Sequence, residues 1–355
     1  MDDRNLRLFK KRRIRTTLKR LFRPLRKGSR IYVGCGQEQR EGFVHCDIRK
    51  HSNVQVRCSA WELDRHFADA EHIYSRDLIE RLCAEEIENY LRSAYAALAL
   101  GGVIEADDLD VRVQVEGEEE GCTSSPLRSL LARAGFSRIA IEREDGRVFT
   151  TAKKMLEFGE RQVAPEIAMV RADHRGRYLW ASQFLSGEGH VCDLACGIGY
   201  GSWILAESKC CDAVSGFDLE AEAIAYAEEF YSHPKATFQV GDITSSVWGE
   251  SIDVVVSFET IEHLPDPVPF LQRVRSSLRA GGKLFCSTPN QTTMPFKKER
   301  FPYHVRHFTP DEFRVLLEDC GFEVLSMHSQ HDVNSEGIND DEDGLFLLAI
   351  ATPLE

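Results

Sequence analysis

The sequence lacks an apolar run long enough to cross a bilayer. Its longest charge-free apolar stretches are residues 93–104 and 344–354, whereas a membrane-spanning helix needs about 20 residues. The N-terminus has no apolar core or small-residue cleavage site of a secretory signal. None of the 11 Cys belongs to a CxxC pair, which disfavours a zinc ribbon or a disulfide framework and is typical of a reducing compartment. We therefore expect a cytoplasmic protein without a transmembrane helix.

Basic residues are scarce outside the first thirty positions. Residues 1–30 contain 13 of the 44 Lys and Arg and only 2 of the 57 acids, so this part carries +11 and the remaining 325 residues carry −24. Binding of nucleic acid requires clustered basic side chains on the binding face. The acidic body of the chain is therefore not expected to bind nucleic acid.

The basic head, residues 1–28, also has an apolar pattern. Apolar residues recur there at helical spacing between Lys and Arg, at Ile14, Leu18, Leu21, Phe22 and Leu25. This pattern predicts a basic amphipathic helix, which can lie on anionic lipid. We expect peripheral contact with the inner face of the membrane, a solvated basic arm, or a helix that packs on an acidic part of the body.

Past the head, apolar strand-like runs alternate with helical stretches, the pattern of parallel α/β sheets. Three segments have similar counterparts later in the chain, in the same order: 29–36 and 190–197, 96–105 and 276–285, 130–141 and 316–327. An internal duplication is the simplest explanation. We predict two α/β domains in tandem, residues 29–153 and 160–355, with a helical stretch over 166–185.

The second copy contains a glycine-rich turn between a strand and a helix. The segment 191–207 passes through Gly197 and Gly199, and such glycines let the backbone approach a ligand closely. About twenty residues later a strand ends in Asp218, where a carboxylate can accept hydrogen bonds from a ribose. A further short strand ends near Asp242.

This order of acids and glycines resembles class I S-adenosylmethionine-dependent methyltransferases. The blocks 252–264 and 281–290 are similar to the fourth and fifth strands of that family. The resemblance implies two Rossmann-like methyltransferase domains, with S-adenosyl-L-methionine as the cofactor of the second. It implies that Asp193 and the glycine turn border the methionine, Asp218 binds the ribose, and Asp242 with Ile243 holds the adenine. The implied cofactor residues are Asp193, Ala195, Gly197, Gly199, Tyr200, Asp218, Leu219, Asp242, Ile243 and Phe258.

The segment 258–267, FETIEHLPDP, contains the candidate catalytic residues. Glu259, Glu262 and His263 stand at i, i+3 and i+4, so on one helical turn they would share a face at the carboxyl edge of the sheet. In one hypothesis His263 is a general base, oriented by a neighbouring carboxylate. In a second hypothesis the three residues belong to a metal site. In a third, His263 only shapes the pocket.

The metal hypothesis adds a histidine from residues 301–313. Glu259, Glu262 and His263 would bind Mg²⁺ or Mn²⁺ together with His304 or His307. Such an ion would clamp a vicinal diol and lower its pKa. This set resembles metal-assisted methyltransferases, although relatives without a metal share the ExxEHL block, so both hypotheses stay open.

The first copy departs from this pattern at the positions that matter. Tyr32 stands where the second copy has Asp193, and Arg81 stands where it has His263. Only 11 residues separate Gly36 from Asp47, against 21 at the corresponding place, so the crossover helix must be shortened or absent. We predict a reduced, non-catalytic domain that serves in substrate capture, packing or dimerisation, with cofactor binding at its remaining glycine turn as the alternative.

The second copy is also similar to methyltransferases of bacterial surface-polysaccharide biosynthesis. The shared segments are the ACGIGYGS turn, the VVSFETIEHL block, the STPN strand end and PYHVRHF. That resemblance implies O-methylation of a sugar hydroxyl on a glycan or lipid-linked glycan. Two alternatives stay open: a small-molecule O-methyltransferase of the quinone or catechol type, and a non-catalytic scaffold built from methyltransferase-like domains. A homo-oligomer is compatible with each.

Overall fold

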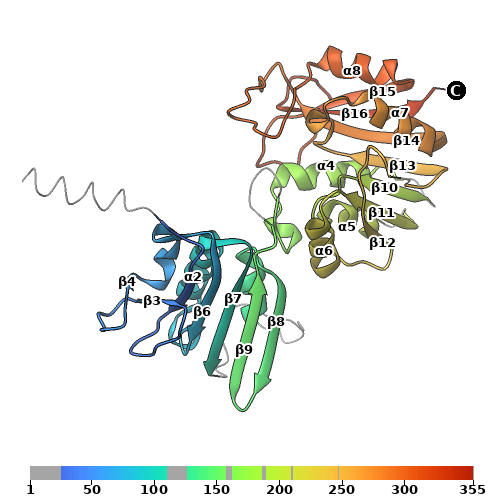
Figure 1. Ribbon diagram of the computed structural model, residues 1–355. Helices are drawn as coiled ribbons and strands as arrows, with labels where there is room; N and C mark the ends of the chain where they lie inside the picture. Colours follow the sequence, from blue (N-terminus) through green and yellow to red (C-terminus); the bar gives the residue numbers. More distant parts are fainter. Residues whose placement is uncertain are drawn as a thin grey trace, which may run out of the picture. The chain divides into compact units, whose positions relative to one another are not determined.

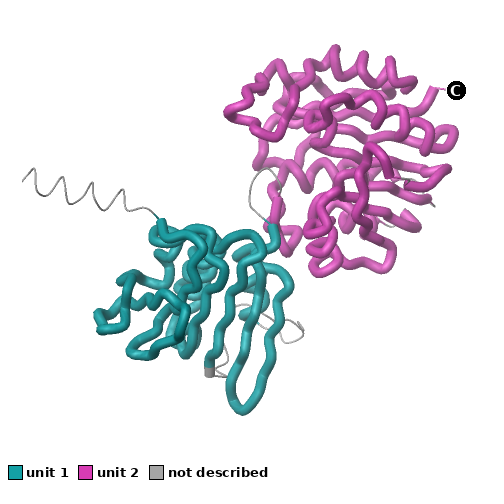
Figure 2. The backbone as a smooth tube through the Cα atoms, in the orientation of Figure 1, with its two compact units in different colours: residues 1–157 teal, residues 158–355 magenta. Residues whose placement is uncertain are grey.

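The chain divides into two compact units, residues 1–157 and 158–355 (Figure 2). The computed structural model describes residues 25–109, 126–156, 162–185, 189–208, 211–246 and 248–354. The predicted basic helix of the head therefore lies almost wholly outside the described residues. The division between the units falls in the gap between the two predicted domains. None of the described helices is long and apolar enough to cross a membrane.

The first unit is built on a seven-stranded sheet in which β9 runs antiparallel to both of its neighbours (Figure 1). In spatial order the strands are β4 (Val56–Arg57), β3 (Val44–Asp47), β2 (Arg30–Val33), β6 (Ala70–Arg76), β7 (Leu98–Leu109), β9 (Arg147–Lys153) and β8 (Ser137–Glu144). A separate parallel pair joins β1 (Arg26–Lys27) to β5 (Phe67–Ala68). The described helices are η1 (Ala60–Arg65), η2 (Ile79–Arg81), α2 (Ala84–Ala97) and α3 (Pro126–Arg133).

The second unit has a seven-stranded sheet of the same kind. In spatial order its strands are β12 (Ala236–Val240), β11 (Ala213–Asp218), β10 (His190–Leu194), β13 (Ile252–Ser257), β14 (Leu278–Pro289), β16 (Phe346–Pro353) and β15 (Phe322–Gln330). Its helices are η3 (Ile167–Met169), α4 (Ala172–Ser182), α5 (Tyr200–Glu207), α6 (Ala221–Phe230), η4 (Ile261–His263), α7 (Val268–Ser277) and α8 (Pro310–Asp319). Helix α4 falls within the predicted helical stretch 166–185.

The two sheets share one strand order and one set of strand directions. They differ in the crossovers at the beginning of each sheet. In the second unit α5 and α6 connect β10 to β11 and β11 to β12. In the first unit residues 34–43 and 48–55 make the same connections without a helix. The short spacing between Gly36 and Asp47 predicts this difference.

Both faces of the second sheet are covered, which explains its nearly continuous apolar strands. On one face Leu284 and Cys286 of β14 belong to a core cluster with α7 and α8 (Figure 1). Their neighbour Phe285 points to the other face, where its ring lies 5.5 Å from that of Trp180 in α4. Fully buried side chains of this size each contribute about 1.5–3 kcal/mol to the stability of the fold. The packed sheet therefore supports the loops at its carboxyl edge.

Candidate functional site

The turn after β10 has an open side at Gly197. This glycine has φ 57°, and a Cβ placed on it would meet no atom within 4 Å. Gly199 has φ 87°, and its Cβ would lie 2.5 Å from that of Ala227, so packing and backbone both require glycine. Ala195 is also left-handed, with φ 64°, which costs about 1–3 kcal/mol. The turn is thus a strained cradle at the N-terminal end of α5, where backbone amides favour polar or anionic groups.

Asp218, at the end of β11, fixes this turn. Its Oδ2 accepts a hydrogen bond from the N–H of Gly197 at 2.9 Å, and its Oδ1 accepts one from Glu220 at 3.0 Å. The neighbouring apolar side chains of Leu219 and Val240 are 72% and 56% exposed. An open glycine, a carboxylate and exposed apolar side chains at one sheet edge fit a ligand with a polar tail, a ribose and a flat base.

Two residues implied for the adenine have contacts of their own. Oδ1 of Asp242 accepts hydrogen bonds from the N–H and the hydroxyl of Thr244, and these bonds lower the pKa of Asp242. The side chain of Ile243 is buried in the core cluster of this unit. Asp242 therefore shapes the loop after β12, and Ile243 supports that loop from below.

Asp193 lies beneath the glycine turn and is fully buried. It accepts hydrogen bonds from Tyr178 of α4 at 3.1 Å and from Ser202 of α5 at 2.7 Å. Burial raises the pKa of its carboxyl to about 7. Phe258 also packs here, with its ring 5.0 Å from that of Tyr178. These contacts make Asp193 a brace between β10, α4 and α5.

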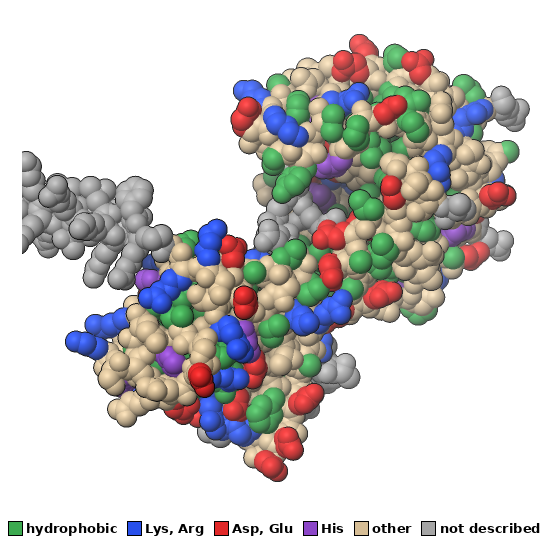
Figure 3. Space-filling model, viewed as in Figure 1, with side chains coloured by type: hydrophobic (Ala, Val, Ile, Leu, Met, Phe, Trp, Pro, Cys, Tyr) green, Lys and Arg blue, Asp and Glu red, His purple; other side chains and the backbone are tan. Residues whose placement is uncertain are grey.

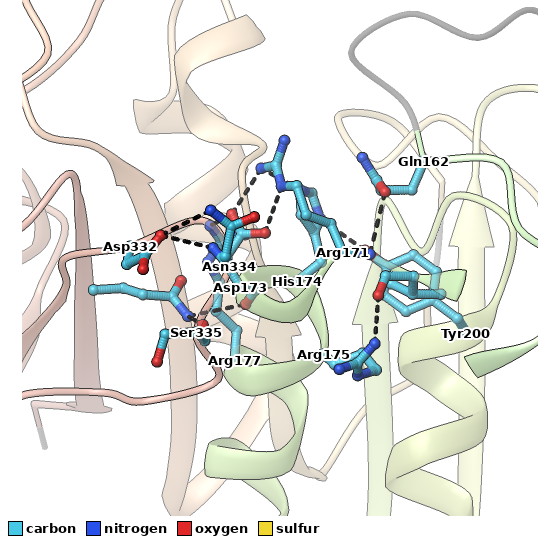
Figure 4. Close-up of polar contacts among 12 residues, drawn as sticks. Gln162, Arg171, Asp173, His174, Arg175, Arg177, Tyr200, Asp332, Asn334 and Ser335 are labelled. Atoms are coloured by element: carbon cyan, nitrogen blue, oxygen red, sulfur yellow. Dashed lines mark hydrogen bonds and ion pairs between the residues drawn. The ribbon is translucent and has the colours of Figure 1, made fainter. Parts of the chain in front are cut away.

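Helix α4 contributes residues to which the sequence analysis assigned no role (Figure 4). Nδ1 of His174 lies 3.0 Å from the hydroxyl of Tyr200, and burial lowers the pKa of His174 to about 3. Arg171 pairs with both carboxylate oxygens of the buried Asp173, and Arg177 lies 3.1 Å from the same carboxylate. The signal in the sequence is RADHRGR, a charged run just before the methyltransferase-like motifs. It orders the chain beside the glycine turn.

The backbone reverses sharply after β13. Glu259 has φ 51°, and only then does the short 3₁₀ turn η4 begin. The predicted single helical turn bearing Glu259, Glu262 and His263 is therefore wrong. The carboxylate of Glu259 accepts a hydrogen bond from the hydroxyl of Ser287 at 2.8 Å, while its N–H donates to the same oxygen. The left-handed backbone at Glu259 therefore keeps this residue off the turn that carries Glu262 and His263.

Glu262, His263 and His304 come together at this edge. Each offers one ligand atom, and these atoms lie within 4.8 Å of one another; Glu259 does not join this group. The N–H of Val305 donates to the carbonyl of Glu262 at 2.7 Å and so holds the segment bearing His304 against η4. Of the two histidines considered for a metal, the structure brings His304 into the group. We call Glu262, His263 and His304 the edge centre.

The edge centre combines a buried carboxylate with two imidazoles. Glu262 is fully buried, with the hydroxyl of Thr288 as a hydrogen-bonding neighbour of its carboxyl group. Burial, with the nearby Glu259, holds the pKa of Glu262 well above its usual range. Nε2 of His263 lies 4.0 Å from Oε1 of Glu262. Because Nδ1 of His263 bonds the carbonyl of Tyr303 at 3.2 Å, a neutral His263 carries its lone pair on Nε2.

The rim of the edge centre is exposed and partly apolar. The side chain of His263 is 35% exposed, and Tyr303 and Val305 are 68% and 41% exposed. On the face shown in Figure 3, histidine side chains of the second unit lie at the surface beside apolar ones. An acceptor in solution can therefore reach Nε2 of His263.

The first unit repeats the turn, with Gly36 as open as Gly197, but has other residues around it. The N–H of Gly36 donates to Oδ2 of Asp47 at 2.9 Å, the counterpart of the Gly197 bond. Tyr32 then donates a 2.6 Å hydrogen bond to Glu38, the residue at the position of Gly199. The bulkier pair occupies positions that the second unit keeps small or braced from below.

Residues 155–327 match the model of a family described as a methyltransferase domain. The second unit is a class I S-adenosylmethionine-dependent methyltransferase domain. The family uses S-adenosyl-L-methionine, and the open glycine turn with Asp218 fits that cofactor. The fold and the turn predicted from the sequence of this methyltransferase domain are confirmed.

Several curated proteins are similar to the methyltransferase domain. A "Probable S-adenosylmethionine-dependent methyltransferase" of Mycolicibacterium smegmatis is 34% identical over 38% of this chain and 52% of its own length. The phosphoethanolamine N-methyltransferase 3 of Arabidopsis thaliana is 30% identical over 40% of this chain and 30% of its own. The ubiquinone biosynthesis O-methyltransferase of a Ruegeria species is 33% identical over 21% and 35%. The chain spans about half, or less, of the length of these relatives.

Among solved structures, an S-adenosylmethionine-dependent methyltransferase from Methanosarcina mazei is 25% identical. It covers 50% of this chain and 98% of its own, with a TM-score of 0.41.

Proposed function

We propose that this protein is an O-methyltransferase that transfers a methyl group from S-adenosylmethionine to a sugar hydroxyl of a glycan or lipid-linked glycan. The arrangement of the edge centre is the observation that favours a hydroxyl as the methyl acceptor. A hydroxyl must lose its proton to become a good methyl acceptor, and Nε2 of His263 beside a buried carboxylate can take that proton. A neutral amine acceptor already has a lone pair and has less need of such a base.

The cofactor would lie along the glycine turn. Gly197 offers its open side, Asp218 holds the turn and faces the ribose, and Leu219 offers an exposed apolar surface to the base. S-adenosylmethionine, when bound, supplies a methyl group already activated on a sulfonium sulfur. The protein then needs chiefly to hold the acceptor oxygen in line, and such positioning lowers the barrier substantially.

His263 is set up to hold and move one proton. The carbonyl of Tyr303 keeps the proton of the neutral ring on Nδ1, so the acceptor's proton goes to Nε2. The imidazolium that forms lies 4.0 Å from Oε1 of Glu262. A positive charge at that distance lowers the raised pKa of the Glu262 carboxyl, and the carboxylate, once ionised, favours the charged ring. Glu262 therefore supports the base, and Glu259 holds the loop after β13 through Ser287.

A divalent ion in the edge centre is a second version of the same function, favoured by the buried carboxylate of Glu262. An ionised carboxylate is costly to bury, and a cation beside it would offset that cost. Since Glu259 does not join, the donor set is two imidazoles and one carboxylate. This set suits Mn²⁺ better than Mg²⁺, which prefers oxygen ligands. The ion would lower the pKa of a vicinal diol.

Two acceptor classes compete. The segments shared with surface-polysaccharide methyltransferases support a sugar diol, and the basic head would bring the enzyme to lipid-linked substrates. A quinone or catechol is the alternative, and a ubiquinone biosynthesis O-methyltransferase is among the similar proteins. Both classes offer adjacent hydroxyls, so the edge centre serves either, and the acceptor must be identified by experiment.

For the remaining parts we propose non-catalytic roles. The first unit would serve in substrate capture, packing or dimerisation, because Tyr32 and Arg81 stand there in place of Asp193 and His263. The head, residues 1–28, would bind the inner face of the membrane. Sedimentation with anionic liposomes should recover the full chain but not a chain lacking residues 1–27. Equal recovery of both would refute membrane contact through the head.

Calorimetry with S-adenosylmethionine separates an enzyme from a scaffold. We expect binding by the wild type and strong loss of binding in Gly197→Ala, whose new methyl group would enter the open side of the turn. A wild type that does not bind would refute the enzyme and leave the scaffold alternative.

A further inference from the structure

We propose that His307 is a positioning residue that fixes the tautomer of His304, so that His304 presents the lone pair of Nε2 to the edge centre. The proposal rests on the proposed function of that centre, but it concerns a residue outside it. Two hydrogen bonds link His304 to His307 and His307 to the main-chain carbonyl of Met294. In each of them chemistry decides which group is the donor.

The carbonyl of Met294 decides which nitrogen of His307 carries a proton. Nδ1 of His307 lies 2.6 Å from this oxygen, and a carbonyl oxygen only accepts hydrogen bonds. Nδ1 of His307 must therefore carry a proton. The ring is buried beside His304. A neutral His307 with a proton on Nδ1 has its lone pair on Nε2.

The second step follows from the first. Nε2 of His307 lies 2.7 Å from Nδ1 of His304, and His304 is also buried. Since Nε2 of His307 accepts, Nδ1 of His304 donates and carries its proton there. In a neutral ring, a proton on Nδ1 leaves the lone pair on the other nitrogen. The lone pair of His304 is then on Nε2, the nitrogen not committed to His307.

Aromatic packing holds the two rings in this arrangement. Phe301 stacks on His304 with ring centroids 5.1 Å apart and an angle of 22°. The same phenyl ring meets His307 edge-on at 4.6 Å, and Phe296 lies 5.5 Å from His307. Lys298 donates to the carbonyl of His304 at 3.2 Å and so fixes the main chain. A 180° flip of either ring would keep its plane but break its hydrogen bonds.

The edge centre then has two imidazoles prepared in the same way. The carbonyl of Tyr303 sets His263, and His307 sets His304, and each leaves a lone pair on Nε2. This state is needed by a proton acceptor and by a metal ligand alike. His307 touches neither Glu262 nor an acceptor in this role, so its effect passes wholly through His304.

The test compares His307→Gln with His307→Leu in the full chain. The Gln carbonyl can accept from His304 and its amide can donate to Met294, whereas Leu can do neither. Nitrogen-15 NMR of histidine-labelled protein distinguishes protonated from unprotonated ring nitrogens. We expect His304 to keep an unprotonated Nε2 in the wild type and in His307→Gln, and to populate the other tautomer in His307→Leu. An unchanged tautomer in His307→Leu would overturn the proposal.

Turnover gives a second, independent readout. We expect His307→Leu to lower kcat about 10- to 100-fold, with the Kd for S-adenosylmethionine unchanged and with recovery in His307→Gln. Phe301→Leu is the matched control, because it removes packing but keeps the hydrogen bonds and should keep the tautomer. If His307→Leu does not fold, His307→Met replaces it. The NMR result needs no substrate, so it stands even if no acceptor is methylated.

Discussion

The N–H of Gly197 donates a hydrogen bond to the carboxylate of Asp218 at 2.9 Å, and the first unit repeats this bond between Gly36 and Asp47 at the same length. In each unit the bond ties the turn after one strand to the end of the next strand. The surroundings then differ: the glycine is open in both turns, but the first unit has Tyr32 and Glu38 where the second has Asp193 and Gly199. The same substitution can therefore be made at Asp218 and at Asp47, and the variant of the first unit serves as the control for that of the second.

The first prediction concerns Asp218. Asp218→Asn should weaken binding of S-adenosylmethionine about 10- to 100-fold, because hydrogen bonds to a charged group contribute about 1.5–3 kcal/mol. The matched variant Asp47→Asn should leave the Kd unchanged. Isothermal titration calorimetry measures both. Equal losses in the two variants would mean that the cofactor binds elsewhere or in both units.

The second prediction concerns the number of S-adenosylmethionine molecules that one chain binds. One S-adenosylmethionine should bind per chain, because in the first unit Tyr32 and Glu38 stand where the second unit has Asp193 and Gly199, and no helix follows the turn. Equilibrium dialysis at saturating ligand gives the number directly. Two sites per chain in the wild type, reduced to one by Asp47→Asn, would contradict a non-binding first unit.

Catalysis should depend on His263. His263→Gln should lower kcat about 100- to 10,000-fold, the range for loss of a general base, while the Kd for S-adenosylmethionine stays within about twofold. His328→Gln is the control, because His328 bonds Asp340 and Ser326 on strand β15 and its loop. Steady-state kinetics with calorimetry separates the effects. Normal turnover by His263→Gln would remove this residue from the chemistry.

A divalent ion makes a separable prediction. If Mn²⁺ occupies the edge centre, EDTA should abolish turnover, Mn²⁺ should restore it better than Mg²⁺, and Glu262→Gln should weaken Mn²⁺ binding measured by electron paramagnetic resonance. The paramagnetic signal reports binding without turnover. Undiminished activity after EDTA would reject the metal version and leave His263 as a metal-free base.

Asp193 predicts a pH dependence of stability. Burial raises its pKa to about 7 in the folded state, against about 3.9 when unfolded. Between these values the folded state holds a proton that the unfolded state has lost, so stability falls as pH rises. Without ligand, the unfolding midpoint of Asp193→Asn should therefore rise relative to wild type from about pH 4 to pH 7, and the difference should be constant outside that range. If the difference in midpoint between Asp193→Asn and wild type instead became smaller over this range, Asp193 would not be protonated in the folded state.

The sequence predicted those parts of the fold that depend on local pattern. The strand ending in Asp218, the glycine turn and the helix within 166–185 follow from apolar periodicity and from glycine at a positive φ. The missing crossover helix between Gly36 and Asp47 followed from chain length alone. Such features are set by residues close together in the sequence.

Other features of the site depend on contacts that spacing does not encode. Glu259 adopts a left-handed backbone that non-glycine residues rarely take, so the i, i+3, i+4 spacing misplaced it on a helix. The burial of Asp193 depends on Tyr178, which lies on a helix that precedes the turn. The link from His304 through His307 to Met294 needs the folded loop between β14 and α8. These contacts join segments whose distance only the tertiary structure sets.

Transfer of isotope-labelled methyl from S-adenosylmethionine into fractionated cell-surface glycans and lipid-linked glycans tests the central claim most directly. The account predicts label in an ether-linked methyl group on a sugar, found by mass spectrometry after hydrolysis, with wild type and His328→Gln but not with His263→Gln. Label in a quinone or an amine instead, or no label from a wild type that binds S-adenosylmethionine, would contradict it.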